Sequence, residues 1–320
     1  MGKTAFLFPG QASQYPGMGK DLAEKFAAAR RVFDEADEAL GFAISKLCFE
    51  GSEDELKLTE NTQPAILAVS IAALRVLEER GIDAPGFVAG HSLGEYSALV
   101  AVGSLAFADA VRLVRKRGRY MQEAVPAGEG AMAAILGLAR AQVEELCKRS
   151  ANGQIVATAN LNSPEQTVIS GHAAAVKRAV ELASASGAKR AVVLPVSAPF
   201  HSELMMPAQK RLEADLRATP FAPLRVPLVT NVDAEVVSQG DEACDALIRQ
   251  VSLPVRWEES VRTMIELGAD HFVEIGPGRV LCGLLRQIDR SAHAVNAEDE
   301  ASLTAALEKL ARLRADSAEA

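Results

Sequence analysis

The stretch GHSLG at residues 90–94 has the residue types of a serine nucleophile held in a tight turn. It follows a short apolar segment and leads into a run with helical spacing. In a strand-turn-helix elbow, glycines at 90 and 94 keep side chains out of the turn, and a helix beginning at Leu93 directs its free amides at charge developing beside Ser92. The alternative is a Gly-Ser turn without a chemical role. A catalytic role therefore requires a base.

A serine nucleophile needs a histidine within hydrogen-bond reach in the folded chain. His91 adjoins the serine, and we expect it to pack or hydrogen-bond beneath the elbow. His201 lies in VSAPFHSELMMPA, where the chain is expected to cross between two lobes and where binding sites concentrate. Its alternative role is to cap a helix that starts near Ser202. The remaining histidines, which have structural explanations near the starts of predicted elements, are His172, His271 and His293.

A helix predicted over residues 107–125 carries an apolar stripe at spacings of four and three residues. Arg117 lies on the opposite flank from the other basic residues, in an apolar neighbourhood with Ala110, Leu113 and Ala124. An arginine there is costly unless it has an anion to bind. That anion is either a buried Asp or Glu of the chain or a substrate carboxylate, which the guanidinium fork matches in a bidentate geometry.

The elements that must position these residues alternate between strand and helix. Apolar strands are predicted over residues 4–8 and 86–89, with helices over residues 21–40 and 64–80 between them. Farther on, the order β-α-β-β-α-β predicts an inserted lobe of the split βαβ type. We therefore expect an α/β-hydrolase-like core built on a parallel sheet, with a ferredoxin-like small subdomain. The expected ranges are 1–124 and 198–320 for the large subdomain and 125–197 for the small one.

Composition excludes several classes of function. The net charge of −8 argues against binding of nucleic acid or of an anionic membrane surface, because both need clustered Lys and Arg. The four cysteines form no C-x-x-C pair, so we expect buried thiols in a reducing compartment and no metal site. No apolar run reaches the length of a signal peptide or a membrane span, which favours a cytoplasmic location.

Seven motifs follow one another along the chain. They are FPGQASQ at 8–14, GHSLGEY at 90–96, RG at 117–118 with MQ at 121–122, NLNSP at 160–164, APFHS at 198–202, RQVSLPVRW at 249–257 and EIGPG at 274–278. Together they resemble the malonyl-CoA:acyl carrier protein transacylases, which load malonyl units for fatty acid synthesis. The resemblance runs from about residue 3 to residue 310.

The resemblance implies a catalytic role for five residues. Ser92 would take the malonyl group from coenzyme A as an ester, and His201 would deprotonate the serine and then protonate the departing thiolate. The backbone carbonyl of Gln250 would orient the histidine in place of an acid. The amides of Gln11 and Leu93 would form the oxyanion hole. No cofactor is implied beyond the phosphopantetheine that coenzyme A and the holo carrier protein bring as substrates.

The resemblance also implies a malonyl-binding pocket. Arg117 would bind the malonyl carboxylate, which agrees with its unusual place on the helix. Phe200 resembles family members that accept malonyl, because a bulky ring beside the α-carbon would obstruct a methyl group. Further positions that line or support the family's pocket are His91, Met121, Asn160, Asn162 and Val280.

One position departs from the family pattern. The N-terminal motif usually has a second glycine where this chain has Ala12. If that position requires a positive φ, alanine strains the loop by about 1 kcal/mol or more and could tilt the amide of Gln11. If φ is negative, nothing is lost.

Three other functions stay open at this point. A serine hydrolase shares the elbow but gives no reason for Arg117, a silent carrier-binding module would not need Ser92, and a polyketide acyltransferase differs only in pathway. The expected partners of a monomeric transacylase are malonyl-CoA and a small acidic carrier protein, approached through basic residues near the cleft. The candidates for this basic surface are Arg115, Lys116, Arg119, Lys189 and Arg190.

Overall fold

A mostly parallel sheet forms the centre of the larger lobe, and the computed structural model describes residues 2–196 and 198–319. Among these residues its strands lie in the order β10-β9-β1-β2-β7-β8, and only β7 and β8 are antiparallel neighbours. The strands are β1 (Lys3–Phe8), β2 (Phe87–Gly90), β7 (Leu228–Val229), β8 (Val236–Val237), β9 (Ala269–Ile275) and β10 (His293–Ala297).

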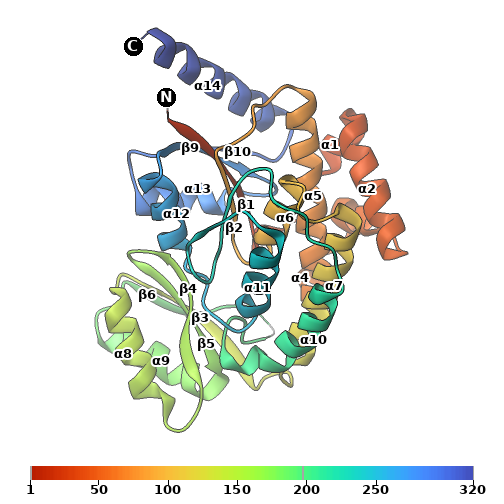
Figure 1. The fold of residues 1–320 in the computed structure, drawn as a ribbon. Coiled ribbons are helices and arrows are strands. Elements are labelled where there is room, and N and C mark those ends of the chain that lie inside the picture. The colour runs from red at the N-terminus through yellow and green to blue at the C-terminus, as the bar shows by residue number, and fades with distance from the viewer. Residues whose placement is uncertain (1, 197, 320) are drawn as a thin grey trace.

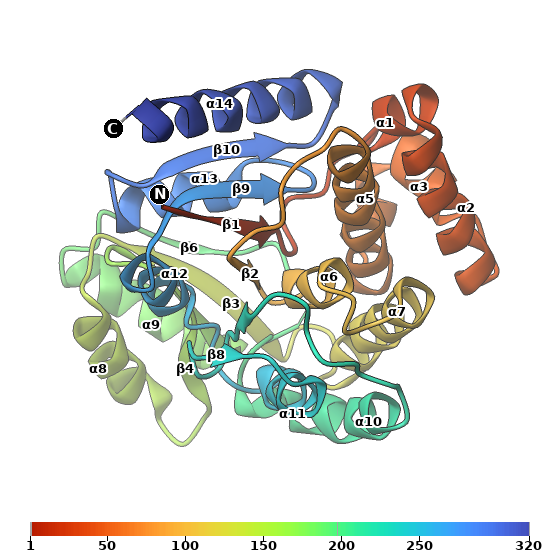
Figure 2. The ribbon, with the colours of Figure 1, turned by 45° about the horizontal axis from the view of Figure 1, so that its top comes forward.

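Helices cover both faces of this sheet (Figure 2). Phe6 and Phe8 of β1 point into one core, under α5 and α6, while Ala5 and Leu7 point into a second core, under α12 and α13. This alternation follows from the two-residue period of a strand. The helices of the lobe are α1 (Lys20–Lys25), α2 (Ala27–Leu40), α3 (Ile44–Glu50), α4 (Glu53–Lys57), α5 (Thr59–Glu79), α6 (Gly94–Ala101), α7 (Phe107–Glu123), α10 (Met206–Arg217), α11 (Gly240–Gln250), α12 (Trp257–Glu266), α13 (Val280–Ile288) and α14 (Glu300–Glu319), with a short 3-10 turn at Glu203–Met205.

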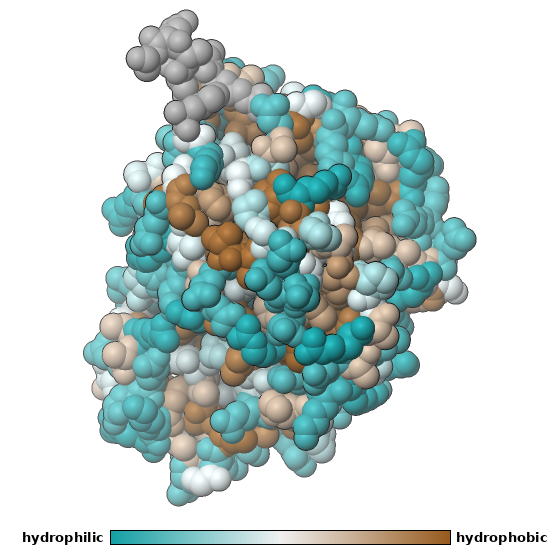
Figure 3. All heavy atoms as spheres, viewed as in Figure 1, coloured by the Kyte–Doolittle hydropathy of each residue, from teal (hydrophilic) through white to brown (hydrophobic). Residues whose placement is uncertain are grey.

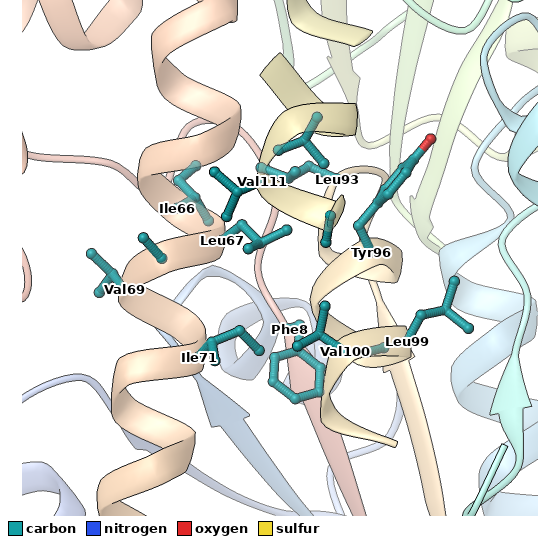
Figure 4. Close-up of a cluster of buried hydrophobic side chains, with 14 of the residues drawn as sticks. Phe8, Ile66, Leu67, Val69, Ile71, Leu93, Tyr96, Leu99, Val100 and Val111 are labelled. Atoms are coloured by element: carbon teal, nitrogen blue, oxygen red, sulfur yellow. The ribbon is translucent and has the colours of Figure 1, made fainter. Parts of the chain in front are cut away.

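Helix α5 is the central helix of the first core. Every residue from Thr62 to Leu74 is buried, so this part of the helix is enclosed on all sides. Figure 4 shows its side chains meeting those of α6 and α7 around Phe8. The sequence predicts a start at Pro64, but the helix begins at Thr59. Proline has no N–H for the carbonyl of Glu60, and Arg115 Nη1 donates to that oxygen instead, at 3.3 Å.

The helix predicted over residues 21–40 consists of two helices, α1 and α2. Phe26 between them is extended, with φ −123° and ψ 123°, and its N–H donates to the carbonyl of Leu22. The chain therefore turns at Phe26, and its ring packs against the first core as a partly buried side chain.

The middle of the chain forms a smaller lobe with a sheet and a core of its own (Figure 1, yellow-green). Its strands lie in the order β4-β5-β3-β6, and all described neighbours are antiparallel. The elements are β3 (Gly130–Leu136), α8 (Arg140–Ala151), β4 (Val156–Ser163), β5 (Gln166–His172), α9 (Ala173–Ala185) and β6 (Arg190–Val193). Residues 1, 197 and 320, which end the expected ranges, lie outside the described residues.

Backbone hydrogen bonds join the two lobes directly. Val255 of the larger lobe donates to the carbonyl of Ala159 at 2.8 Å and accepts from the N–H of Leu161 at 2.9 Å, both on β4. Asn160 therefore lies at the junction of the lobes.

The surface and the thiols follow ordinary patterns. Figure 3 shows apolar side chains in scattered groups among hydrophilic ones. Across residues 2–196 and 198–319, none of the helices has both the length and the apolar character that crossing a bilayer requires. The same residues contain no cluster of His, Cys, Asp or Glu suited to a metal ion. All four cysteines are buried and free.

Candidate active site

Ser92 lies in the sharp turn between β2 and α6, at the carboxyl end of the parallel sheet. A Cβ on Gly90 would lie 1.9 Å from the carbonyl carbon of Gly94, and a Cβ on Gly94 would lie 2.0 Å from the carbonyl oxygen of Phe8. Both glycines are therefore needed for close backbone approach, as the sequence pattern predicts. Ser92 itself has φ +51°, in the left-handed region that non-glycine residues rarely adopt.

The structure brings Ser92 and His201 together from positions 109 residues apart. Ser92 Oγ lies 2.7 Å from His201 Nε2, and His201 Nδ1 lies 2.8 Å from the backbone oxygen of Gln250. Because a carbonyl oxygen can only accept, Nδ1 carries the proton and Nε2 is the acceptor for the serine hydroxyl. Burial and the charge of Arg117 lower the pKa of His201 to about 3, so the imidazole is neutral at neutral pH.

Arg117 is 1% exposed and reaches the nucleophile from α7. Its guanidinium donates to Gln63 Oε1 at 2.8 Å, to Gln250 Oε1 at 2.9 Å and to Ser92 Oγ at 3.0 Å. These partners are all neutral, and Arg117 forms no ion pair with a carboxylate of the described residues. Burial lowers the pKa of Arg117, yet an arginine stays protonated. A positive charge without a direct counter-ion thus lies beside the serine.

A cavity of about 120 Å³ opens next to Ser92. Of the residues that the resemblance implies for the pocket or the oxyanion hole, those lining it are Gln11, Leu93, Arg117, His91, Met121, Asn160 and Phe200. The rest of the wall is formed by Ala12, Gln63, Met132, Leu194, Val196 and His201. Met132, Leu194 and Val196 come from β3 of the smaller lobe and from the segment that begins with β6. The cavity therefore lies between the lobes, where the sequence places His201.

Two of the expected pocket residues do not line the cavity. Asn162 is buried, and its Oδ1 lies 2.9 Å from His91 Nε2. The ring of His91 also packs against Trp257, with centroids 5.5 Å apart, and burial lowers its pKa. Asn162 therefore supports a lining residue. Val280 begins α13, is 46% exposed and lies outside the lining set, so the structure does not bring it to the serine.

Sequence reasoning missed a buried polar network beneath the elbow. Asn231 Oδ1 accepts from the N–H of Ser92 at 2.7 Å, and Asn231 Nδ2 donates to the carbonyl of Gly90 at 2.7 Å. Glu95 accepts from the Asn231 N–H at 2.9 Å and from Gln250 Nε2 at 3.0 Å. Glu95 lies within the GHSLGEY motif, and Asn231 follows β7 directly beside β2. This network could have been predicted, because polar residues that follow adjacent parallel strands lie at the same edge of the sheet.

Ala12 has φ +84° and is exposed. The condition under which the sequence predicts strain is therefore met, because alanine in the left-handed region costs about 1 kcal/mol relative to glycine. The N–H of Ala12 donates to Gln14 Oε1 at 2.8 Å, which holds the turn next to Gln11.

Most residues proposed for a basic docking surface are already paired. Their partners are Glu60 for Arg115, Asp215 for Lys116, Glu123 for Arg119 and Glu165 for Lys189. These contacts reduce the positive field that the side chains present to an acidic partner.

Known proteins resemble this chain in sequence and in fold. The family model for the acyl transferase domain matches residues 5–311. The malonyl CoA-acyl carrier protein transacylase of Bacillus subtilis (strain 168) is 52% identical over 311 residues, which cover 97% of this chain and 98% of that protein. A solved structure of the malonyl CoA-acyl carrier protein transacylase from Coxiella burnetii aligns with a TM-score of 0.95 at 43% identity, covering 97% of this chain and 98% of that one.

A further solved structure is a complex of a type II PKS acyl-carrier protein with its malonyl-transacylase. It aligns with a TM-score of 0.94 at 47% identity and covers 96% of this chain and 99% of that one. With matches of this length and identity to relatives of one name, the chain belongs to the malonyl-CoA:acyl carrier protein transacylase family.

Proposed function

We propose that this chain transfers a malonyl group from malonyl-CoA to the phosphopantetheine thiol of acyl carrier protein, through a malonyl ester on Ser92. The observation that supports this most directly is the guanidinium of Arg117, buried, without a carboxylate partner and 3.0 Å from Ser92 Oγ. A fixed positive charge beside the nucleophile favours an acyl group that ends in a carboxylate. The substrate carboxylate would take the place of the neutral partners that Arg117 now has.

In the first half-reaction, neutral His201 accepts the proton of Ser92 Oγ as the oxygen attacks the thioester carbonyl. The amides of Gln11 and Leu93 donate to the oxygen of the tetrahedral intermediate. The carbon–sulfur bond then breaks, and the imidazolium of His201 gives its proton to the thiolate of coenzyme A. Malonyl-Ser92 and free coenzyme A result.

The second half-reaction runs the same steps with the carrier thiol as nucleophile. His201 takes the thiol proton, the sulfur attacks the ester carbonyl, and the proton returns to Ser92 Oγ as the ester bond breaks. One site serves both half-reactions, so donor and acceptor bind in turn. The carbonyl of Gln250 keeps the proton on His201 Nδ1 throughout, which leaves Nε2 facing each reacting atom.

We also propose the pathway, the partners and the location. The enzyme supplies fatty acid synthesis; polyketide synthesis is the second candidate, because one related transacylase is solved with a type II PKS carrier protein. Malonyl-CoA and the holo carrier protein each bring a phosphopantetheine arm, and the mechanism requires no further cofactor. We propose a monomeric, cytoplasmic enzyme whose Phe200 ring, at the cavity wall, obstructs a methyl-branched acyl group.

We further infer that the lobes are an α/β-hydrolase-like core, residues 1–124 and 198–320, and a ferredoxin-like insertion, residues 125–197. The nucleophile elbow after β2 of a parallel sheet supports the first assignment. The βαββαβ element order and the strand order β4-β5-β3-β6 support the second.

The decisive experiment is intact mass spectrometry after brief mixing of the protein with malonyl-CoA, followed by peptide mapping. We expect one malonyl group on the peptide that contains Ser92, discharged by holo carrier protein, and no adduct on Ser92→Ala. Steady release of coenzyme A with no adduct would instead indicate a hydrolase. Absence of both adduct and release would favour a silent binding module.

A further inference from the structure

Glu95 is a fully buried carboxylate that the reaction steps above do not use. It lies in the first turn of α6, three residues after Ser92, and its exposure is 0%. Oε2 accepts two hydrogen bonds, whereas Oε1 has no partner among the described residues. A buried carboxylate is costly in free energy unless neighbouring groups favour its charge. Its place directly beneath the nucleophile points to a role in the site.

The Gln250 carboxamide bridges Glu95 and Arg117. Gln250 Nε2 donates to Glu95 Oε2 at 3.0 Å, and Gln250 Oε1 accepts from Arg117 Nη2 at 2.9 Å. An amide can be rotated by half a turn with little change of shape, which exchanges its oxygen and nitrogen. Here the carboxylate requires the NH2 group and the guanidinium requires the oxygen, so only one orientation satisfies both. The charge of Glu95 therefore favours that orientation, in the same sense as the guanidinium of Arg117.

Gln250 also forms hydrogen bonds to the residues of the nucleophile and the base. The same Nε2 donates to the backbone oxygen of Ser92 at 2.9 Å and approaches Asn231 Oδ1 at 3.3 Å. Its backbone oxygen accepts from His201 Nδ1 at 2.8 Å. A rotated carboxamide would lose the bonds to Ser92 and Glu95 and would place an NH2 group against the guanidinium.

We propose that Glu95 is a positioning residue whose carboxylate fixes the Gln250 carboxamide, and through it the Arg117 guanidinium and the backbone that carries Ser92. Glu95 touches no substrate and acts on the site through Gln250. This inference rests on the proposed function, because it concerns the rate at which Ser92 is acylated.

The proposal has a consequence for the dependence of the reaction on pH. The charged and titratable groups that act on Glu95 are Arg117 of α7, Asp233 of the loop after β7, Arg249 of α11 and Tyr96 of its own helix. Burial raises the pKa of Glu95 to about 7, against the opposing effects of its hydrogen bonds and of Arg117. His201, with a pKa of about 3, stays neutral above pH 5. Loss of the Glu95 charge below pH 7 should therefore slow acylation by itself.

The test is the rate of malonyl-Ser92 formation, measured by rapid quench and intact mass from about pH 5.5 to about pH 8.5. The donor is malonyl-pantetheine, which has no phosphate group to titrate. For the wild type we expect a plateau above pH 7 and a fall below it. Glu95→Gln keeps the size and one acceptor oxygen, so its rate should be flat with pH and about tenfold below the plateau, the difference between a charged and a neutral acceptor.

Two further variants separate positioning from general support. Gln250→Met removes the carboxamide and keeps the backbone carbonyl, so its profile should be flat, and Glu95→Gln should cost nothing more in that background. Ser97→Ala is the matched control, because Ser97 is buried on the same helix and its hydroxyl has no hydrogen-bond partner among the described residues. It should retain the wild-type rate and profile.

The outcomes are distinguishable from one another. Absence of an adduct on the wild type at every pH would overturn the proposed function itself. An adduct that forms at a pH-independent rate, or at the wild-type rate and with the wild-type profile in Glu95→Gln, would overturn only the role of Glu95. Should Glu95→Gln fail to fold, a fall below pH 7 that persists in Gln250→Met would overturn it as well.

Discussion

Ser92 and His201 both have positive φ angles, +51° and +55°. Non-glycine residues hold such angles only where the surrounding structure enforces them. Around Ser92 the enforcement comes from Asn231 and Gln250, which bind its N–H and its carbonyl oxygen. These two hydrogen bonds therefore hold the Ser92 backbone in the conformation from which its hydroxyl reaches His201 without substrate.

Arg117→Ala should reduce malonyl transfer by about thirtyfold or more, because a buried guanidinium that binds a carboxylate contributes about 2–5 kcal/mol. Acetyl transfer has no distal carboxylate to lose, so it should hold steady or improve. The measurement is Ser92 acylation by malonyl-CoA and by acetyl-CoA, with Arg112→Ala as the control, since Arg112 lies exposed on the same helix and pairs with Asp109. An equal loss with both donors in a folded variant would make Arg117 a general scaffold residue.

Substitutions at Ala12 test how much backbone strain the loop after β1 tolerates. Ala12→Gly relieves the left-handed strain and adds chain entropy to the unfolded state, so the free energy of unfolding should change by less than about 1 kcal/mol. Ala12→Val, with a branched side chain at φ +84°, should lower it by more than about 1 kcal/mol and slow acylation. Urea unfolding and the acylation rate check both variants. A valine variant as stable and fast as the wild type would show that the loop does not hold this angle.

At the scale of elements, the site depends on how closely α6 approaches β1. The carbonyl oxygen of Phe8 at the end of β1 faces Gly94 at the start of α6, at a distance that leaves no room for a Cβ. This packing holds the positive end of the helix against the carboxyl edge of the sheet, where Ser92 lies. The packing of α6 against β1 therefore requires glycine at position 94, and the turn is not the only reason for it.

Gly94→Ala should lower the free energy of unfolding by about 2 kcal/mol or more, because its Cβ would lie 2.0 Å from Phe8 O. Gly283→Ala is the opposite case: Gly283 is exposed inside α13, and apart from its chain neighbours and the backbone of its own helix no atom lies within 4 Å of the new Cβ. There alanine should raise stability by up to about 1 kcal/mol through helix propensity. Urea unfolding of both variants checks the pair, and similar effects at the two sites would contradict the packing argument.

At the scale of the whole molecule, two buried groups make stability depend on pH in opposite senses. His201 has a pKa lowered from 6.5 to about 3, so it makes stability rise with pH between these values. Glu95 has a pKa raised from 4.5 to about 7, so the folded state holds a proton that the unfolded state has lost, and stability falls across that interval. Both effects are complete above about pH 8, one unit beyond the folded-state pKa of Glu95.

Glu95→Gln removes the second effect and leaves the first. Between about pH 4.5 and pH 8, the free energy of unfolding of the wild type should therefore fall relative to the variant by up to about 3 kcal/mol. Urea unfolding of both proteins at the two pH values measures the difference. A constant difference between the proteins would show that Glu95 has no raised pKa.

The acidic net charge of −8 bears on the carrier half-reaction. We expect transfer to the carrier to slow as salt rises from about 0.05 M to about 0.5 M, while the coenzyme A half-reaction barely responds. The reason is that basic residues near the cleft, although most of them form ion pairs, must still attract an acidic carrier. Separate rates for the two half-reactions check this. Equal salt sensitivity of the two half-reactions would show that the carrier does not dock by electrostatic attraction.

The sequence by itself determined much of this protein. Apolar strands ending in glycine turns predicted the parallel sheet and the elbow, since both are local consequences of residue type. Helical spacing separated Arg117 from the other basic residues of α7, and the structure buries it. The motifs identified the family, and the departure from the family pattern at Ala12 marked a position where a positive φ strains the loop.

Only the tertiary structure decided which groups meet. His201 and Gln250 lie 49 residues apart and contact through a single backbone oxygen, which no side-chain pattern reveals. Glu95 and Asn231 form a network because β7 and β2 are neighbours in the sheet, although 136 residues separate them. Val280 matched a motif position yet lies exposed, outside the cavity. Periodicity and motifs report local environment, whereas contacts between distant residues depend on the packing of whole elements.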